Sequence, residues 1–598
     1  MKNVILLIFS CITLQNLIAQ ECPMQMGMNL YSNVNWSREM PFANLMFQAS
    51  IWVTQNQNFV PEGINAFDTE VLDSIEVDGD GYPLSLPQKV EGTEAPQSLL
   101  TLLIKDNGGI HPDGNYTLTY EGQGEVILVG QDVSSLIFAE NNKRVYHIVV
   151  QSKGDIGLKI ISSEISNPVH NIKVMLPEHD ETEIYNKAFI EKIKKYKTIR
   201  FMNWQRTNGS DQVDWDSRPS TSYYTINTSK GVPLEYLLEL SNLVDANIWI
   251  NIPHQANEDY VKNMAGMIKS ELKEDLKVYL EYSNEVWNDQ FAQHQWVNEN
   301  APNVLLSPEQ KYAYFTKKAF AGFTEVFIDD LSRIVRVLSG QQANPNVINR
   351  SSQAMKDQLG ADLYDAISCT GSLSFTPLQF QQMDEHTTVE EISTFVRKNI
   401  NELFKTAMQL HKTKADSLGK GFVAYESTGL GSVSYISNVK PSFADAIGEY
   451  NRDTALYNIY TEWLKYLRDE IGMDLCCSFV LADDNEANYG SYGHLNSIYD
   501  AAPYPPAYQA ISDINCDALE VNKENYLTDF LIYPNPAISI IYFGFESDSY
   551  QLYDINGKLV ASSSIKVKEI DISKLTSGIY FVKFHIGNKM ATGKVIKI

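Results

Sequence analysis

Eight short β-branched runs alternate with amphipathic helical segments, and this alternation limits the possible folds more than any other feature of the chain. Helical periodicity separates successive runs, for example over residues 234–244 and 309–329. Alternating strands and helices predict parallel strands; doubly wound sheets share the pattern, but eight units favour closure into a (β/α)8 barrel. The runs cover residues 27–31, 198–202, 247–252, 277–282, 333–338, 366–369, 421–425 and 475–481.

A second, β-rich stretch lies between the first and second of these strands, over residues 60–176. Its short runs are separated by Gly and Asp turns, and the spacing is typical of a β-sandwich. The Asp-Gly repeat at 78–81 lacks the ligand spacing of a calcium loop and indicates a hairpin turn. We therefore predict a β-sandwich inserted after strand one of the barrel. The barrel domain comprises residues 21–59 and 177–516.

The first twenty residues have the pattern of a secretory signal peptide. Lys2 precedes an apolar stretch over residues 4–18, and a small residue follows near residue 20. No later segment has 18 apolar residues in a row, so we expect no membrane span. Five cysteines remain after residue 20: Cys22, Cys369, Cys476, Cys477 and Cys516. Export permits disulfides, and Cys22 could pair with Cys516 across the barrel domain, but the sequence leaves the connectivity open.

The C-terminal segment follows a polar linker at residues 517–529. Residues 530–598 alternate strands and turns and predict a small antiparallel β-sandwich. Its YPNP start at 533–536, the Asn-Gly turn at 556–557, the strand at 578–582 and the basic end occur in one order. This order resembles the type IX secretion sorting domain of Bacteroidota. The resemblance implies the type IX machinery as a partner, export across the outer membrane, and then release or surface attachment. An ordinary carbohydrate-binding or fibronectin-like module is the alternative.

The charge balance restricts the partners of the chain. Lys and Arg number 48 and Asp and Glu 74, for a net charge of −26, which disfavours nucleic acid and anionic membrane surfaces. Aromatic residues make up 11% and suit both packing and stacking on sugars. We find no zinc motif, nucleophile elbow, phosphate loop or dinucleotide fingerprint, and we expect no cofactor and no metal.

Two glutamates directly follow the fourth and seventh predicted strands. Glu285 ends the string Ser283-Asn284-Glu285, and Glu426 follows residues 421–425. Catalytic groups of such barrels lie at the carboxyl ends of strands, and cleavage of a glycosidic bond requires two carboxyl groups. Either glutamate alone could be a solvated surface residue, but the pair at these strands is more specific.

Asn-Glu after strand four with Glu after strand seven resembles the signature of clan A of the glycoside hydrolases. The resemblance implies a retaining hydrolase of a β-linked poly- or oligosaccharide, with Glu285 as acid/base, Glu426 as nucleophile and Asn284 bound to the sugar 2-hydroxyl. Clan members often carry a Trp at the end of strand eight, which here runs into residues 482–485 without one. The alternative is a glycan-binding or adhesive surface protein without catalysis.

Further candidates surround this pair. His254 follows strand three, where the clan often has a sugar-contacting His, although a single His is more often structural. Trp287 and Trp204 could form stacking walls or pack in the core. Arg200 is a substrate-site candidate at the end of strand two, with Glu281 as its possible buried partner. Asp483 and Asp484 could contact sugar hydroxyls or belong to a polar loop.

Overall fold

The computed structural model describes residues 24–56, 73–93, 95–150, 154–304, 307–359, 363–430, 442–484, 492–514, 532–554, 558–586 and 589–598. They fall into two compact units, residues 1–515 and 516–598. The predicted signal peptide and linker lie outside the described residues, as do Cys22 and Cys516. Cys369, Cys476 and Cys477 are buried and free.

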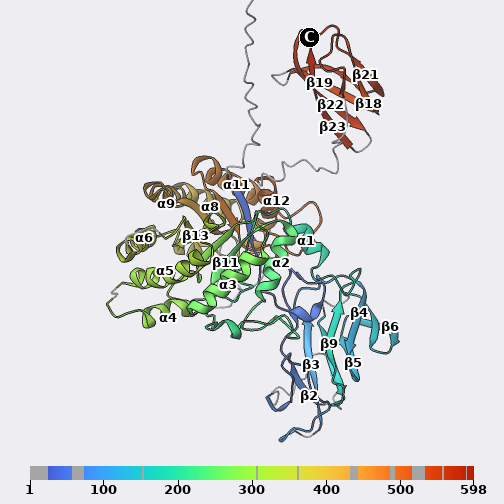
Figure 1. Ribbon diagram of the computed structural model, residues 1–598, viewed down its shortest axis with the longest axis vertical. Coiled ribbons are helices and arrows are strands. Elements are labelled where there is room, and N and C mark those ends of the chain that lie inside the picture. The colour runs from blue at the N-terminus through green and yellow to red at the C-terminus, as the bar shows by residue number, and fades with distance from the viewer. Residues whose placement is uncertain are drawn as a thin grey trace, which may run out of the picture. The chain divides into compact units, whose positions relative to one another are not determined.

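The first unit contains the closed barrel of eight parallel strands that the alternation predicted (Figure 1). The first strand, β1, pairs with β10 on one side and with β16 on the other, which closes the sheet. In sequence order the barrel strands are β1 (Gln25–Asn29), β10 (Thr198–Arg200), β11 (Asn247–Ile252), β12 (Val278–Tyr282), β13 (Ile334–Ser339), β14 (Ala366–Cys369), β15 (Gly421–Ser427) and β16 (Leu475–Ser478).

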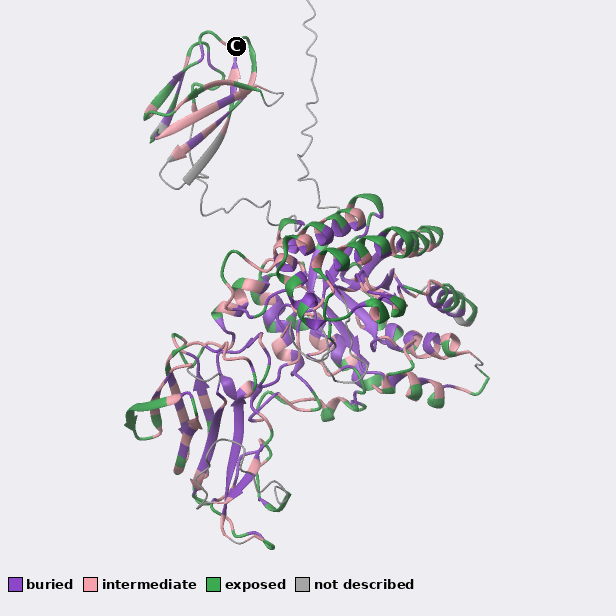
Figure 2. Ribbon diagram, turned by 180° about the vertical axis from the view of Figure 1, so that it is seen from behind, coloured by how far each residue is buried: buried purple, intermediate pink, exposed green. Residues whose placement is uncertain are grey.

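Helices surround the barrel, with their outer faces exposed and the strands buried behind them (Figure 2). Capping boxes fix the starts of α5, α7 and α8, at Ser307, Thr376 and Thr388. The predicted helix over 392–412 consists of two helices joined by a π-helical turn at Ile400–Phe404. The helices of this unit are α1 (Lys187–Ile193), α2 (Leu234–Val244), α3 (Glu258–Glu271), α4 (Ala292–Asn300), α5 (Pro308–Val326), α6 (Asn346–Leu359), α7 (Pro377–Gln382), α8 (Val389–Asn399), α9 (Lys405–Leu418), α10 (Ala444–Arg452), α11 (Thr454–Lys465) and α12 (Pro506–Ile514).

Side chains fill the inside of the barrel. Trp249, Tyr279, Val423 and Leu475 belong to one buried cluster of inward-facing residues from different strands. A methyl group added at Gly27 would come within 2.5 Å of the Cys477 sulfur, so only glycine fits there. The barrel centre is therefore a packed core, and a ligand has to bind at its mouth.

The insertion between β1 and β10 contains two four-stranded antiparallel sheets, as the sandwich prediction requires (Figure 1). The first sheet already includes β2 at residues 53–56, before the expected start at residue 60. Buried side chains of both sheets share one hydrophobic core with the barrel. The sheets are β2 (Val53–Asn56), β3 (Gln97–Ile104), β8 (Ile156–Ser163) and β5 (Gly124–Gly130), and β6 (Val133–Glu140), β7 (Lys143–Ile148), β4 (Gly114–Glu121) and β9 (His170–Met175).

The second unit has a three-stranded and a four-stranded antiparallel sheet around its own small core, which includes Ile541, Leu552, Val582 and Phe584. Its sheets are β17 (Ile532–Tyr533), β18 (Ile540–Ser547) and β21 (Val567–Asp571), and β20 (Leu559–Ser563), β19 (Ser549–Asp554), β22 (Gly578–Ile586) and β23 (Lys589–Lys597).

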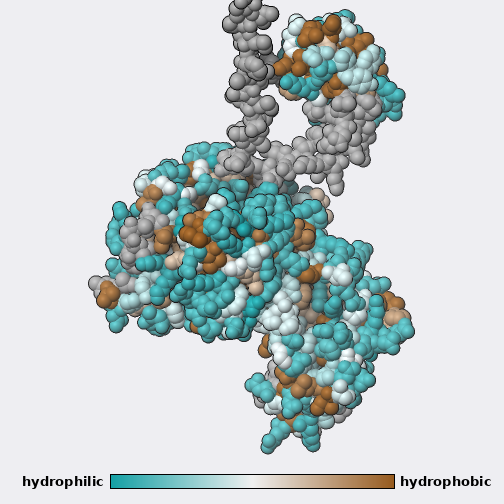
Figure 3. All heavy atoms as spheres, viewed as in Figure 1, coloured by the Kyte–Doolittle hydropathy of each residue, from teal (hydrophilic) through white to brown (hydrophobic). Residues whose placement is uncertain are grey.

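Hydrophilic side chains cover most of the visible face of the first unit, with scattered apolar patches (Figure 3). Within the described residues, no helix combines the length and the apolar character needed to cross a membrane.

Candidate active site

A cavity of about 700 Å³ receives side chains that follow the carboxyl ends of several barrel strands. Asn284 and Glu285 come directly after β12, and Glu426 is the penultimate residue of β15. The structure thus brings both predicted glutamates to one cavity. Amides, hydroxyls and aromatic rings make up much of the remaining wall: Tyr31, Ser32, Asn203, Asn208, Trp287, Asn288, Phe291, Gln341, Gln342, Thr370, Ser372, Ser374, Phe404, Tyr425, Thr428, Phe479 and Tyr492.

The backbone that presents Glu285 is strained. Ser283 has a φ of 56° and Glu285 a φ of 42°, both in the left-handed region that side chains rarely adopt. Two hydrogen bonds hold the turn: the Ser283 amide donates to Ile252 O at 2.8 Å, and Asn251 Nδ2 donates to Ser283 O at 2.7 Å. Strain that the surrounding structure maintains is concentrated at functional sites.

A buried ion pair lies beneath the cavity. Arg200 Nη2 is 2.9 Å from Glu281 Oε2, and both side chains are at most 1% exposed. Trp249 Nε1 and Asn251 Nδ2 also donate to that oxygen, at 3.1 and 3.0 Å, and Ser339 Oγ donates to the other oxygen at 2.7 Å. Glu281 is therefore the buried partner of Arg200 that the sequence suggested.

Arg200 also contacts two residues that line the cavity, Glu426 and Asn284. Its Nη1 is 3.1 Å from Glu426 Oε1, and its Nη2 donates to Asn284 Oδ1 at 2.8 Å. Burial opposes the charge of Arg200, but the carboxylates of Glu281 and Glu426 outweigh this effect and raise its pKa. Since Arg200 is wholly buried, it orients two residues of the cavity rather than contacting a substrate.

Glu285 has different partners. Tyr425 Oη donates to its Oε1 at 2.8 Å, and Asn288 Nδ2 donates to its Oε2 at 3.0 Å. Burial raises the pKa of Glu285 and of Glu426, and the charge of Glu285 further raises that of Glu426. The pair therefore resists losing both protons, and the guanidinium beside Glu426 favours ionisation there.

Asn284 lines the cavity while its amide is held on two sides. Its Oδ1 accepts from Arg200, and its Nδ2 donates to Asn208 Oδ1 at 3.1 Å. A side-chain amide has two N–H donors, so one is left for a ligand. Trp287 also lines the cavity, partly buried, and its indole nitrogen has no partner among the described residues.

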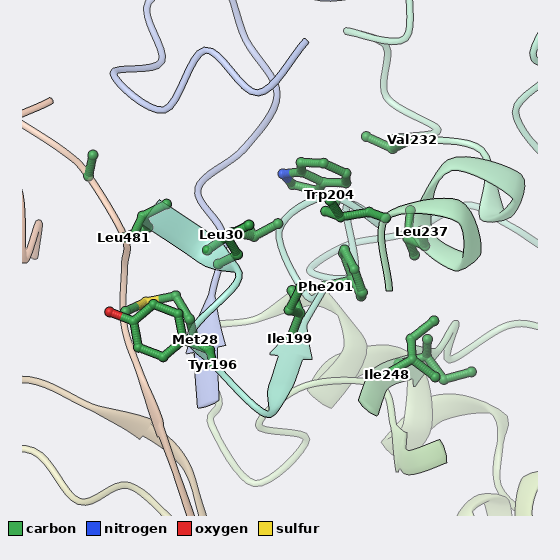
Figure 4. Close-up of a cluster of buried hydrophobic side chains, with 14 of the residues drawn as sticks. Met28, Leu30, Tyr196, Ile199, Phe201, Trp204, Val232, Leu237, Ile248 and Leu481 are labelled. Carbon is green, nitrogen blue, oxygen red and sulfur yellow. The ribbon is translucent and has the colours of Figure 1, made fainter. Parts of the chain in front are cut away.

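Trp204 does not form a stacking wall. It is wholly buried, and its ring stacks on Phe42 with centroids 5.4 Å apart. Figure 4 shows it among apolar side chains that include Phe201, Val232 and Leu237. Trp204 is therefore a core residue, because the loop after β10 folds back onto the segment that precedes the inserted sandwich.

His254 is also outside the main cavity. Its ring packs edge to face on Trp296 of α4, with centroids 5.4 Å apart, and it lines a separate cavity of about 480 Å³ beside α3 and α5. Burial lowers its pKa to about 4, so the ring is neutral at physiological pH. The described structure gives His254 no place beside Glu285 and Glu426.

The residues of the cavity that sequence reasoning missed include Tyr425, Asn288 and Phe479. Phe479 was hidden because the predicted eighth strand extended to residue 481, whereas β16 ends at Ser478. The shorter strand makes Phe479 the first residue beyond it, so an aromatic ring lies near the position where we noted the missing Trp. Its ring meets Tyr492 edge to face at 5.7 Å.

No group of three or more His, Cys, Asp or Glu side chains suited to a metal ion occurs in the described part of the chain.

Comparison with protein families identifies the C-terminal unit. Residues 531–598 match the family described as "Secretion system C-terminal sorting domain". The chain therefore carries a type IX sorting domain, which marks it for export and for release or attachment at the cell surface, as its motifs predicted. Comparison with curated proteins gave no match.

Solved structures with similar folds are only distantly related. An endo-β-1,4-mannanase double mutant from Cellulomonas fimi has 10% identity and a TM-score of 0.28, covering 61% of this chain and 80% of its own. The CBM22-1–GH10 modules of a Clostridium thermocellum endo-1,4-β-D-xylanase have 12% identity and a TM-score of 0.33, covering 81% and 97%. A family 51 α-L-arabinofuranosidase from Bifidobacterium longum has 8% identity and a TM-score of 0.38, covering 70% and 90%. Likenesses at this level say nothing of the reaction of this chain.

Proposed function

We propose that the chain is a secreted, retaining glycoside hydrolase that cleaves a β-linked glycan. The observation that carries this proposal is the contrast between the two carboxyl groups in one cavity. Arg200 contacts Glu426, whereas Glu285 has a phenol and an amide as partners. Hydrolysis of a glycoside by double displacement requires one ionised and one protonated carboxyl group.

In the first step, the Glu426 carboxylate attacks the anomeric carbon and forms an ester bond to the sugar. The bond from that carbon to the leaving oxygen breaks, and Glu285 gives its proton to this oxygen. In the second step, Glu285 takes a proton from water as the water oxygen attacks the anomeric carbon. The ester bond breaks, Glu426 is again a carboxylate, and the product keeps the starting anomeric configuration.

The residues around the pair support this division. Arg200 holds Glu426 and Asn284 in fixed positions, and the free N–H of Asn284 is available for a sugar hydroxyl beside the attacked carbon. Trp287 and Phe479 offer aromatic faces in the same cavity.

Purified protein should be tested on β-linked polysaccharides and on aryl β-glycosides, with the product anomer followed by NMR. Glu426→Gln should nearly abolish turnover of every substrate, because a side-chain amide cannot replace the carboxylate that forms the ester. Glu285→Gln should slow substrates with poor leaving groups most and activated aryl glycosides least, since these need no proton.

Glu390→Gln is the matched control, because this glutamate is exposed in the first turn of α8. It should behave as the unchanged protein. Inversion of the anomer would contradict the retaining reaction. Binding of glycans without hydrolysis would instead support the alternative, a glycan-binding surface protein.

A further inference from the structure

A third acidic side chain of the cavity has no part in the mechanism above. Asp483 follows β16, lines the cavity and is 4% exposed. Its Oδ1 accepts from the Asp484 amide at 2.8 Å, while its buried Oδ2 has no partner among the described residues. A buried polar atom without a partner is costly, and a ligand hydroxyl in the cavity would relieve that cost.

The backbone holds Asp483 firmly. Its amide donates to Leu495 O at 3.2 Å, and the Leu495 amide donates to Leu481 O at 3.0 Å. A methyl group added at Gly493 would come within 2.4 Å of the Asp483 nitrogen, so the two segments pack as closely as glycine permits. The carboxyl group is thus preorganised rather than part of a loose loop.

Asp483 lies on the Glu426 side of the cavity. β16 pairs with β15, the strand that carries Glu426, and the Phe479 amide just beyond β16 donates to Ser427 O at 2.9 Å. The sugar ring that Glu426 attacks would therefore pass beside Asp483.

The surroundings of Asp483 are acidic. Glu39 is wholly buried, its Oε1 accepts from the Ala482 amide at 3.3 Å, and its Oε2 has no partner among the described residues. Burial raises the pKa of Asp483 to about 7 and that of Glu39 to about 8, and the charge of Asp483 contributes to the latter. The nearby Arg38 is paired with Asp484 at 3.1 Å.

From this geometry we propose that Asp483 is a specificity-determining residue: it binds a hydroxyl group of the attacked sugar and selects an uncharged sugar over a uronic acid. This inference rests on the proposed function. A carboxyl group with a free oxygen can hydrogen-bond a hydroxyl. A sugar carboxylate beside Asp483 would instead bring a further negative charge to a buried acidic site whose nearby cation, Arg38, is already paired with Asp484.

Binding tests this directly, with matched hexasaccharides that differ in a carboxylate at C6. Calorimetry should compare β-1,4-mannohexaose with its mannuronate counterpart, and cellohexaose with its glucuronate counterpart, on the full chain. At least one neutral member should bind, and its uronate counterpart should bind at least ~10-fold more weakly.

Asp483→Ala should weaken binding of the neutral hexasaccharide roughly 10- to 100-fold. Asp483→Asn, which keeps the shape and hydrogen-bonding capacity, should recover much of it and reduce the discrimination against the uronate. Glu390→Ala is the control, since it removes an exposed carboxyl group in the first turn of α8, outside the cavity. Near-UV circular dichroism should show all variants folded.

The proposal falls if a uronate binds as tightly as its neutral counterpart, if no neutral hexasaccharide binds, or if folded Asp483→Ala and Glu390→Ala proteins bind alike. Selective binding without any hydrolysis would overturn the proposed function, and Asp483 would then select a sugar that is bound but not cleaved.

Discussion

Arg200 contacts Glu281, Glu426 and Asn284 together. We expect Arg200→Met to cost about 3–5 kcal/mol of unfolding free energy, because it leaves buried carboxylates without their cation. It should also lower kcat roughly 100-fold, since Glu426 and Asn284 lose their common anchor. Urea unfolding and steady-state kinetics on an aryl glycoside measure both effects.

Arg336→Met is the control for Arg200→Met, because it also removes a paired arginine but lies away from the cavity. Arg336 forms two 2.8 Å contacts with Asp365, near the amino ends of the strands. The Arg336→Met variant should have a lower free energy of unfolding and an unchanged kcat. Equal kcat values for the two variants would argue against a positioning role for Arg200.

The hydrogen bond from Tyr425 to Glu285 should affect the pH dependence of kcat/KM. The Tyr425 hydroxyl donates to Glu285 and so lowers the pKa of that carboxyl, against the larger raising effect of burial. Tyr425→Phe removes the donor, and the pKa of Glu285 should rise further. Because Glu285 must be protonated to act as the acid, the alkaline limb of the kcat/KM profile should move to higher pH. A shift to lower pH would contradict this account.

At the scale of single elements, the turn after β12 stores backbone strain that substitution can measure. Ser283 is wholly buried with a φ of 56°, and its hydroxyl has no partner among the described residues. Ser283→Gly and Ser283→Ala both remove the hydroxyl, but only glycine adopts this conformation freely. The glycine variant should be more stable by about 1 kcal/mol in urea unfolding. Equal stabilities would show that the left-handed backbone costs nothing here.

The barrel strands could be predicted because each is a short β-branched run between turn residues, and Glu285 and Glu426 followed from those strands. Strand ends were less certain: three extra residues on the eighth strand concealed Phe479. The surroundings of Trp204 and His254 depend on Phe42 and Trp296, which are distant in the sequence. Local patterns do not contain such tertiary contacts, so the sequence could not decide between a sugar-contacting and a packing role for either residue.

At the scale of the whole molecule, the inserted sandwich and the barrel share one core. Tyr224 Oη accepts from the Trp52 amide at 2.9 Å, and Asn44 Oδ1 accepts from the Val174 amide at 2.9 Å. Replacing residues 53–176 by a short Gly-Ser linker should therefore expose core side chains and leave the barrel unfolded, as followed by circular dichroism and solubility. A folded, active barrel without the insertion would show that the shared core is dispensable.

Removal of the C-terminal unit, in contrast, should leave the rest of the protein folded. Residues 516–598 form a compact unit with its own core, and residues 531–598 match the sorting domain. Few contacts are expected across a boundary of this kind. Purified protein ending at residue 515 should keep its melting temperature within ~2 °C, because the larger core loses no packing. Any hydrolysis should also persist, whereas in the native host the shortened protein should fail to reach the surface or the medium. Loss of hydrolysis in the purified, folded truncation would show that the tail contributes to the site, and normal export would show that residues 531–598 are not the signal that directs it.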